Sequence, residues 1–354
     1  MAAATVAAIL LTGITLYAVL GGADFGGGLW DLLAGGDQRG RLPRQLIDES
    51  ITPVWEANHV WLVFELVIFW TGFPLAFASV MTVTAVPLWL AVGGIVLRGS
   101  GFAFRKEITR PGLVRAAGAT FAFSSLVTPF FMGTVIGAIA TGNVPANATH
   151  SSLEAWTNGT SVLAGFLFVA ACGYLAAVYL TAEASRQGDH DLRSYFIRRA
   201  QAAAIVAGAL SLGLLAELHG SNRALYDRLT GRALPLVIVA GLCGLVVLVL
   251  ISTRTPRLIE ARATAALGVA AVIWGWGVAQ YPVLLPGTGI TIDNAGAPHS
   301  TLVALIVVFV AALVLVGPSF ILLFALQSRR VLRSEESTLL AAADTEPGTT
   351  TPPA

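Results

Sequence analysis

The chain has 354 residues, of which 56% are hydrophobic and only 12% are charged, and its formal net charge is +1. Soluble domains usually carry about 25% charged residues, so this composition excludes an ordinary soluble protein and indicates an integral membrane protein. The near-neutral charge gives no support to a nucleic-acid partner. Cys172 and Cys243 lie singly in apolar runs, which predicts small core side chains rather than a disulfide or metal ligands.

Nine apolar segments reach the length of about 20 residues that a helix needs to cross a bilayer. The second and third are separated by Thr71-Gly72-Phe73-Pro74, where proline prevents a continuous helix. The sequence therefore predicts an all-α, polytopic transmembrane bundle over residues 1–330, and a disordered cytoplasmic tail over residues 331–354. The nine segments are residues 4–25, 53–72, 76–97, 117–140, 160–182, 200–219, 233–252, 264–285 and 300–327.

The distribution of basic residues predicts the orientation, because cytoplasmic loops are enriched in Lys and Arg. With the N-terminus outside, eighteen of the 21 basic residues fall in cytoplasmic segments, and Arg223, Arg228 and Arg232 fall outside. The first apolar run is too long for a signal peptide and is expected to be a retained helix. We therefore expect a bacterial cell-membrane protein with its C-terminal tail in the cytoplasm.

The first predicted helix runs into a glycine-rich motif, residues 17–36, YAVLGGADFGGGLWDLLAGG. This motif places Asp24 in a segment that is otherwise apolar enough for the membrane. An ionisable group at membrane depth is costly unless it is paired or hydrated, so it indicates function. The flanking glycines allow close helix approach and leave room for water. The alternative is that Asp24 caps a helix break or lies at the headgroup boundary.

A second motif, WEANHVWL at residues 55–62, opens the next helix. It places Glu56 in the first turn, near the cytoplasmic side and at the same depth as Asp24, which suits a path for proton uptake. We expect Trp55, Asn58 and His59 to give supporting contacts. A haem-ligand role for His59 is the weaker interpretation, because no partner pattern accompanies it.

Glu65 lies nine positions after Glu56, on the opposite helical face and about 13 Å deeper in the membrane. It is interpreted either as a second proton-relay site or as a structural hydrogen-bonding group. Arg98 lies where the third predicted helix leaves the membrane. It is expected either to contact lipid phosphate or to pair with Asp24, Glu56 or a partner subunit.

Four motifs together resemble subunit II of cytochrome bd-type quinol oxidases: YAVLGGADFGGGLWDLL, PVWEANHVWLV, FP at 73–74 and GIVLRGSGFAFR at 94–105. The resemblance implies two four-helix bundles plus a peripheral helix, paired with a subunit I that carries haem b and haem d-type groups. The acidic positions that the family links to its proton route match Asp24 and Glu56. Relatives often have aspartate at position 56, and Glu65 has no counterpart among the family's hallmark residues.

The function expected from these features is that of a quinol:O₂ oxidoreductase subunit that supports subunit I and delivers cytoplasmic protons through Asp24, Glu56 and Glu65. No catalytic residue, cofactor site or metal site is assigned to this chain, so the chain alone is not expected to be catalytic. The expected partners are subunit I, membrane lipids and the quinone pool. A structural quinone and a small accessory subunit are left open. The alternatives are a cation- or proton-coupled secondary transporter and a purely structural subunit.

Overall fold

The computed structural model describes residues 1–36, 38–51, 55–107, 111–253 and 257–328. The described chain is almost entirely helical, as predicted. Backbone contacts divide it into a unit spanning Met1–Leu302 and a second unit that begins at Val303. The predicted tail, residues 331–354, lies outside the described residues.

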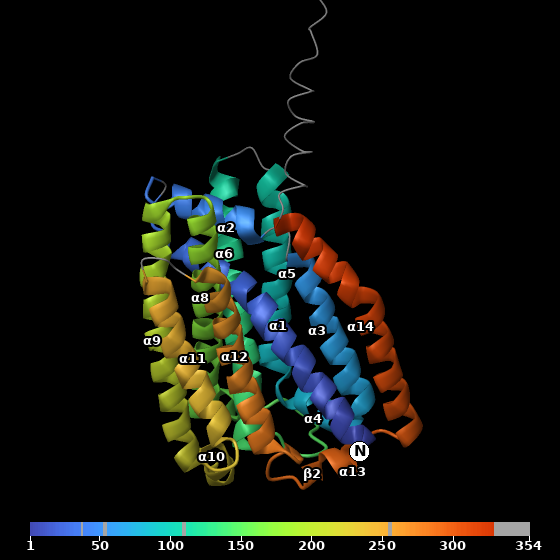
Figure 1. Cartoon of the computed structure of the whole chain (residues 1–354). Coiled ribbons are helices and arrows are strands. Elements are labelled where there is room, and N and C mark those ends of the chain that lie inside the picture. Colours follow the sequence, from blue (N-terminus) through green and yellow to red (C-terminus); the bar gives the residue numbers. More distant parts are fainter. Residues whose placement is uncertain (37, 52–54, 108–110, 254–256, 329–354) are drawn as a thin grey trace, which may run out of the picture. The chain divides into compact units, whose positions relative to one another are not determined.

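The first unit contains long helices together with short helices and one small hairpin (Figure 1). Its long helices are α1 (Ala2–Leu32), α3 (Trp55–Gly72), α5 (Ala85–Glu107), α6 (Pro111–Thr141), α8 (Gly159–Arg186), α9 (His190–Ser221), α11 (Leu234–Ser252) and α12 (Leu258–Gln280). Its shorter elements are α2 (Arg41–Ile51), α4 (Pro74–Val83), α7 (Leu153–Thr157), α10 (Arg223–Thr230), the antiparallel strands β1 (Val283–Leu285) and β2 (Ile290–Thr291), and α13 (Ile292–Ala295). Helix α14 (His299–Ser328) begins in this unit and provides the described part of the second.

Seven of the described helices are long and apolar enough to cross a membrane, or up to eight if one bent pair counts as a single span. The bent pair consists of Val60–Gly72 and Pro74–Val83, whose axes differ by 120°. The prediction of an all-α, multi-pass membrane protein is therefore confirmed. The count of nine spans is not reproduced among the described residues.

The third predicted segment, residues 76–97, is wrong as a single helix, because α4 ends at Val83 and α5 begins at Ala85. Pro87 has no N–H to donate to the Val83 carbonyl, and its ring crowds that position, which favours a break in the helix just before it. The Thr84 hydroxyl and N–H both donate to the carbonyl of Val80, at 2.7 and 2.9 Å, and satisfy the end of α4.

Helix α1 continues to Leu32, beyond the predicted end at residue 25, and the glycine-rich motif is helical up to that residue. A Cβ at Gly26 would overlap the carbonyl of Cys172 in α8, and one at Gly28 would overlap Ser125 in α6. The glycines therefore let α1 lie directly against two neighbouring helices, and this packing offsets their low helix propensity.

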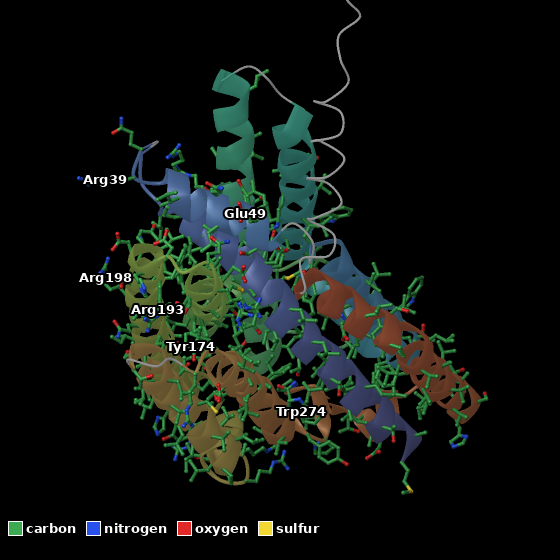
Figure 2. The ribbon with its side chains drawn as sticks, turned by 45° about the horizontal axis from the view of Figure 1, so that its top comes forward. Arg39, Glu49, Tyr174, Arg193, Arg198 and Trp274 are labelled. Atoms are coloured by element: carbon green, nitrogen blue, oxygen red, sulfur yellow. The ribbon has the colours of Figure 1, made fainter. Side chains whose placement is uncertain are left out.

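The long helices of the first unit alternate between two ends of the unit. The start of α1 lies at the same end as α10 and α13, whereas α2 lies at the opposite end (Figure 1). At the first end Asn222 Nδ2 donates to the Ala140 carbonyl at 2.7 Å and joins α9 to α6. At the α2 end Gln187 contacts Glu49, and Figure 2 shows Arg39 and Arg193 near this end as well.

A large apolar cluster lies near the α2 end, between α1, α2, α8, α9, α11 and α12. Leu46 and Ile47 of α2 are buried in it beside Leu175, Phe196 and Ile251. The amphipathic α2, which is not among the nine predicted apolar segments, therefore covers the end of the helix bundle with its apolar face.

Candidate functional site

Asp24 and Arg98 form an ion pair in the interior of the first unit. Arg98 Nη2 lies 2.5 Å from Asp24 Oδ1 and 3.1 Å from the Asp24 carbonyl oxygen, while Nη1 donates to Ser125 Oγ at 2.5 Å. The side chains are 0% and 3% exposed. The lipid-phosphate interpretation of Arg98 is therefore wrong, and the alternative pairing with Asp24 is present. Since α1 is continuous around Asp24, this residue does not cap a helix break.

Close approach of α5 to α6 brings Arg98 into the interior. A Cβ at Gly101 would lie 3.0 Å from the Ala117 carbonyl, so the two backbones nearly touch. The guanidinium carbon lies 4.9 Å from the Phe25 ring centroid and 4.5 Å from that of Phe121. Aromatic faces stabilise a desolvated cation, and the hydrogen bonds to Asp24 and Ser125 satisfy much of its donor capacity.

A second buried carboxylate, Asp31, pairs with Arg44 of α2 and was missed by the sequence reasoning. Arg44 Nε donates to Asp31 Oδ1 at 2.9 Å, and Nη2 donates to the Gly35 carbonyl at 2.6 Å. The signal was present, because Asp31 lies two helical turns after Asp24 and so shares its face of α1. This ion pair attaches α2 to the end of α1.

Glu65 lies in α3 against Gly13 of α1, in a different environment from that of Asp24. The residue is 7% exposed, and a Cβ at Gly13 would overlap its Oε1. Neither carboxyl oxygen has a hydrogen-bond partner among the described residues. Gly13 and Asp24 are eleven residues apart on α1, about 16 Å along the helix axis. Glu65 and Asp24 are therefore two separate sites.

Tyr17 lies on α1 between these two sites and was not singled out from the sequence. Its ring packs edge-on against Phe25, with centroids 6.4 Å apart, and belongs to a cluster with Cys172 and the partly buried Trp61. Its Cε2 lies 3.4 Å from where a Cβ of Gly21 would be, so the absent side chain leaves room for the ring. The buried hydroxyl has no partner among the described residues.

Gly13, Tyr17, Gly21 and Asp24 follow one another at intervals of four, four and three residues on α1. This spacing places all four on one face of the helix. The same face therefore carries the contact with Glu65, the tyrosine hydroxyl and the ion pair. The spacing was visible in the sequence, but the position of Glu65 opposite Gly13 was not.

The remaining predicted site residues are in the first turns of α3. Trp55, Glu56, Asn58 and His59 are helical, and their side chains lie outside the described part of the structure. Their grouping with Asp24 or Arg98 therefore stays a prediction. Within the described part of the chain, no group of three or more His, Cys, Asp or Glu side chains could hold a metal ion.

Comparison with known proteins matches residues 2–327 to the family described as cytochrome bd terminal oxidase subunit II. The chain belongs to this family. The stretch matched to subunit II includes the Asp24–Arg98 pair, Glu65 and the motif at residues 55–62. The resemblance read from the sequence motifs is thereby confirmed.

Individual relatives of the subunit II family align over shorter stretches. The chain is 26% identical over 177 residues to cytochrome bd ubiquinol oxidase subunit 2 of Bacillus subtilis (strain 168), which is 49% of this chain and 50% of the relative. It is 28% identical over 140 residues to cytochrome bd-I ubiquinol oxidase subunit 2 of Escherichia coli (strain K12), 39% of this chain and 36% of the relative. The chain thus spans about half, or less, of these relatives.

A solved structure extends the likeness in fold to nearly the whole chain. A chain of the bd oxidase from Geobacillus thermodenitrificans superposes with a TM-score of 0.73, covering 92% of this chain and 98% of that one. Its sequence identity is 24%, so the match shows a shared fold.

Proposed function

We propose that this chain is subunit II of a quinol:O₂ oxidoreductase in the bacterial cell membrane. In this role it supports a haem-bearing subunit I and contributes to proton delivery from the cytoplasm for the reduction of O₂ to water. Membership of the subunit II family supports the proposal, as do relatives named as ubiquinol oxidase subunits. This family membership also argues against a secondary transporter.

The buried Asp24–Arg98 pair is the observation that carries the proton-delivery part of the proposal. A charged pair inside a membrane helix bundle is costly, and such groups mark proton or ion pathways. We assign the route to Asp24, Glu56 and Glu65, with Trp55, Asn58, His59 and Arg98 as supporting contacts. In this route Asp24 is paired with Arg98, and Glu56 would be the proton carrier near the cytoplasm.

The haem b and haem d-type groups are assigned to subunit I, because this chain's described histidines do not fit a buried axial ligand. His150, His190, His219 and His299 all have exposed side chains. When bound in subunit I, the haems would supply electron transfer and oxygen reduction. A structural quinone and a small accessory subunit stay open as additional partners.

Replacement of Glu56 by Gln tests the proton-delivery proposal. The amide keeps the shape and hydrogen-bonding capacity but cannot release a proton, so we expect quinol-driven oxygen consumption of the assembled complex to fall strongly. Glu56→Asp should retain much of the activity, because the carboxylate is kept and is only one methylene shorter. Rates are compared at matched haem content.

The matched control is Glu154→Gln, a carboxylate in the segment between α6 and α8 with an exposed side chain, which should turn over like the parent. A Glu56→Gln complex that assembles fully and consumes oxygen at the parental rate would remove Glu56 from the proton route.

A further inference from the structure

Glu65 of α3 is a buried carboxyl group at the contact between α1 and α3, and it differs from the two buried carboxylates of α1, Asp24 and Asp31. Each of those two is paired with an arginine. Asp24 has Arg98 and Asp31 has Arg44, each within hydrogen-bond distance. Glu65 is 7% exposed, and both of its carboxyl oxygens lack a hydrogen-bond partner among the described residues. Its carboxyl group lies directly against the backbone of α1 at Gly13.

The surroundings of Glu65 favour its neutral form. An ionised carboxylate without a counter-charge costs several kcal/mol or more in an apolar site, and such a group binds a proton instead. On α1 the facing groups are Gly13 and, one turn further, Tyr17; on α3 itself Trp61 lies one turn away on the same face. Arg98 is already bound to Asp24, about 16 Å further along α1.

Gly13 creates the space that the carboxyl group occupies. Any side chain at position 13 would overlap Glu65 Oε1, so the carboxyl group could stay only if the helices separated. The nearest described proton-carrying group along the same face of α1 is the Tyr17 hydroxyl, which is also buried and without a partner. The face therefore places a tyrosine hydroxyl between Glu65 and the Asp24–Arg98 pair.

We propose that Glu65 is a proton-holding site, kept as a neutral carboxylic acid in the slot that Gly13 leaves between α1 and α3. It is distinct from Asp24, which stays ionised beside Arg98. This inference deepens the proposed function and rests on it for the use of the proton in turnover. The chemistry also makes Glu65 a modification site for apolar carbodiimides, which react with protonated carboxyl groups inside membranes.

The reaction with dicyclohexylcarbodiimide needs no other reagent. The acid proton moves to one carbodiimide nitrogen while a carboxyl oxygen bonds to the central carbon. The acyl group then transfers to the other nitrogen and leaves a stable N-acylurea. The Glu65 peptide gains the mass of one whole carbodiimide, with no leaving group and no change of oxidation state.

The experiment treats membranes that contain the complete oxidase complex with dicyclohexylcarbodiimide and maps the added mass by peptide mass spectrometry. Infrared spectra of the same complex, recorded in H₂O and D₂O, detect the C=O band of a protonated carboxyl group. We expect label on the Glu65 peptide and none on Asp24, and loss of both label and band in Glu65→Gln. Glu154→Gln should keep both, and Glu65→Asp should keep a band at a shifted frequency.

Gly13→Ala supplies a second, independent readout, because the new methyl group displaces the carboxyl group and should change both the labelling rate and the band position. A parent complex with neither label on Glu65 nor a band sensitive to Glu65→Gln or Glu65→Asp would overturn the proposal. Since neither signal requires oxygen consumption, a complex that labels but does not oxidise quinol would contradict the proposed function and leave this inference intact.

Discussion

Asp24 and Glu65 are both buried carboxylates in a membrane helix bundle, and the presence of a cation distinguishes them. Arg98 Nη2 lies 2.5 Å from Asp24 Oδ1, whereas the Glu65 carboxyl group lies against the α1 backbone at Gly13 and has no hydrogen-bond partner among the described residues. An ionised pair with satisfied hydrogen bonds is held in one geometry, and an unpaired carboxyl group binds a proton. The two carboxyl groups therefore lie in different environments, one beside a cation and one without a hydrogen-bond partner among the described residues.

Removing the cation from the Asp24–Arg98 pair should strongly destabilise the subunit. We expect Arg98→Gln to lower the free energy of unfolding by about 3–5 kcal/mol, because it leaves Asp24 buried without a counter-charge. Thermal unfolding of the purified complex, followed by intrinsic fluorescence, measures the effect.

The double variant Asp24→Asn/Arg98→Gln should recover part of this loss, because it removes both charges. The matched control is Arg223→Gln, which breaks the exposed Arg223–Asp227 pair and should have an effect of about 0–1 kcal/mol. If the double variant is no more stable than Arg98→Gln alone, the account of an uncompensated Asp24 charge is wrong.

At the scale of elements, glycines determine how closely α1 lies against its neighbours. Gly26 faces the backbone of α8 at Cys172, and Gly28 faces Ser125 of α6. These contacts position α1 so that Asp24 can reach Arg98 on α5. The motif that suggested chemistry at the sequence level is thus also the packing surface that positions the chemical groups.

Gly26→Ala should disrupt the α1–α8 contact. The new methyl group would overlap the Cys172 carbonyl, which is backbone and cannot rotate away, so the helices must separate. We expect a loss of about 1–3 kcal/mol in stability, together with reduced assembly. Size-exclusion chromatography and thermal unfolding of the complex provide the measurement.

Gly93→Ala in α5 is the control, because nothing lies within 4 Å of its Cβ position and alanine favours the helix. Equal losses from the two substitutions would show that helix propensity, rather than close approach, governs these positions.

At the scale of the whole molecule, the alternation of the helices within Met1–Leu302 agrees with the arginine pattern. Arg223, Arg228 and Arg232 lie in or directly beside α10, at the end of the unit that also holds the start of α1 (Figure 1). The structure thus groups the residues that the topology prediction put on the outer side.

Cysteine accessibility in intact cells tests the orientation itself. A cysteine replacing Ser151, which is exposed at the α10 end, should react with a membrane-impermeant thiol reagent. A cysteine replacing Asp191, exposed at the start of α9, should react only after the cells are opened. Background is low because Cys172 and Cys243 are buried. The reverse pattern would invert the proposed topology.

The sequence alone was enough to predict the membrane class, the helical fold and the family. The bilayer requires each spanning helix to be apolar over its own length, so membrane segments can be predicted one at a time from composition. Long sequence motifs identify a family without reference to the fold. The helix break between α3 and α4 was also predictable, because it depends on the local effect of proline. The second break, before Pro87, was equally local but was obscured by the continuous apolar run.

Only the tertiary structure decided which charged groups meet. Arg98 lies 74 residues after Asp24 and Arg44 lies 13 residues after Asp31. The sequence left lipid phosphate, Asp24, Glu56 and a partner subunit as candidates for Arg98. The pairing depends on how closely α1, α5 and α6 approach, which follows from glycine contacts between distant segments. The position of Glu65 likewise depends on a contact between distant segments. Gly13 of α1 has no side chain, and this leaves the space that the Glu65 carboxyl group of α3 occupies.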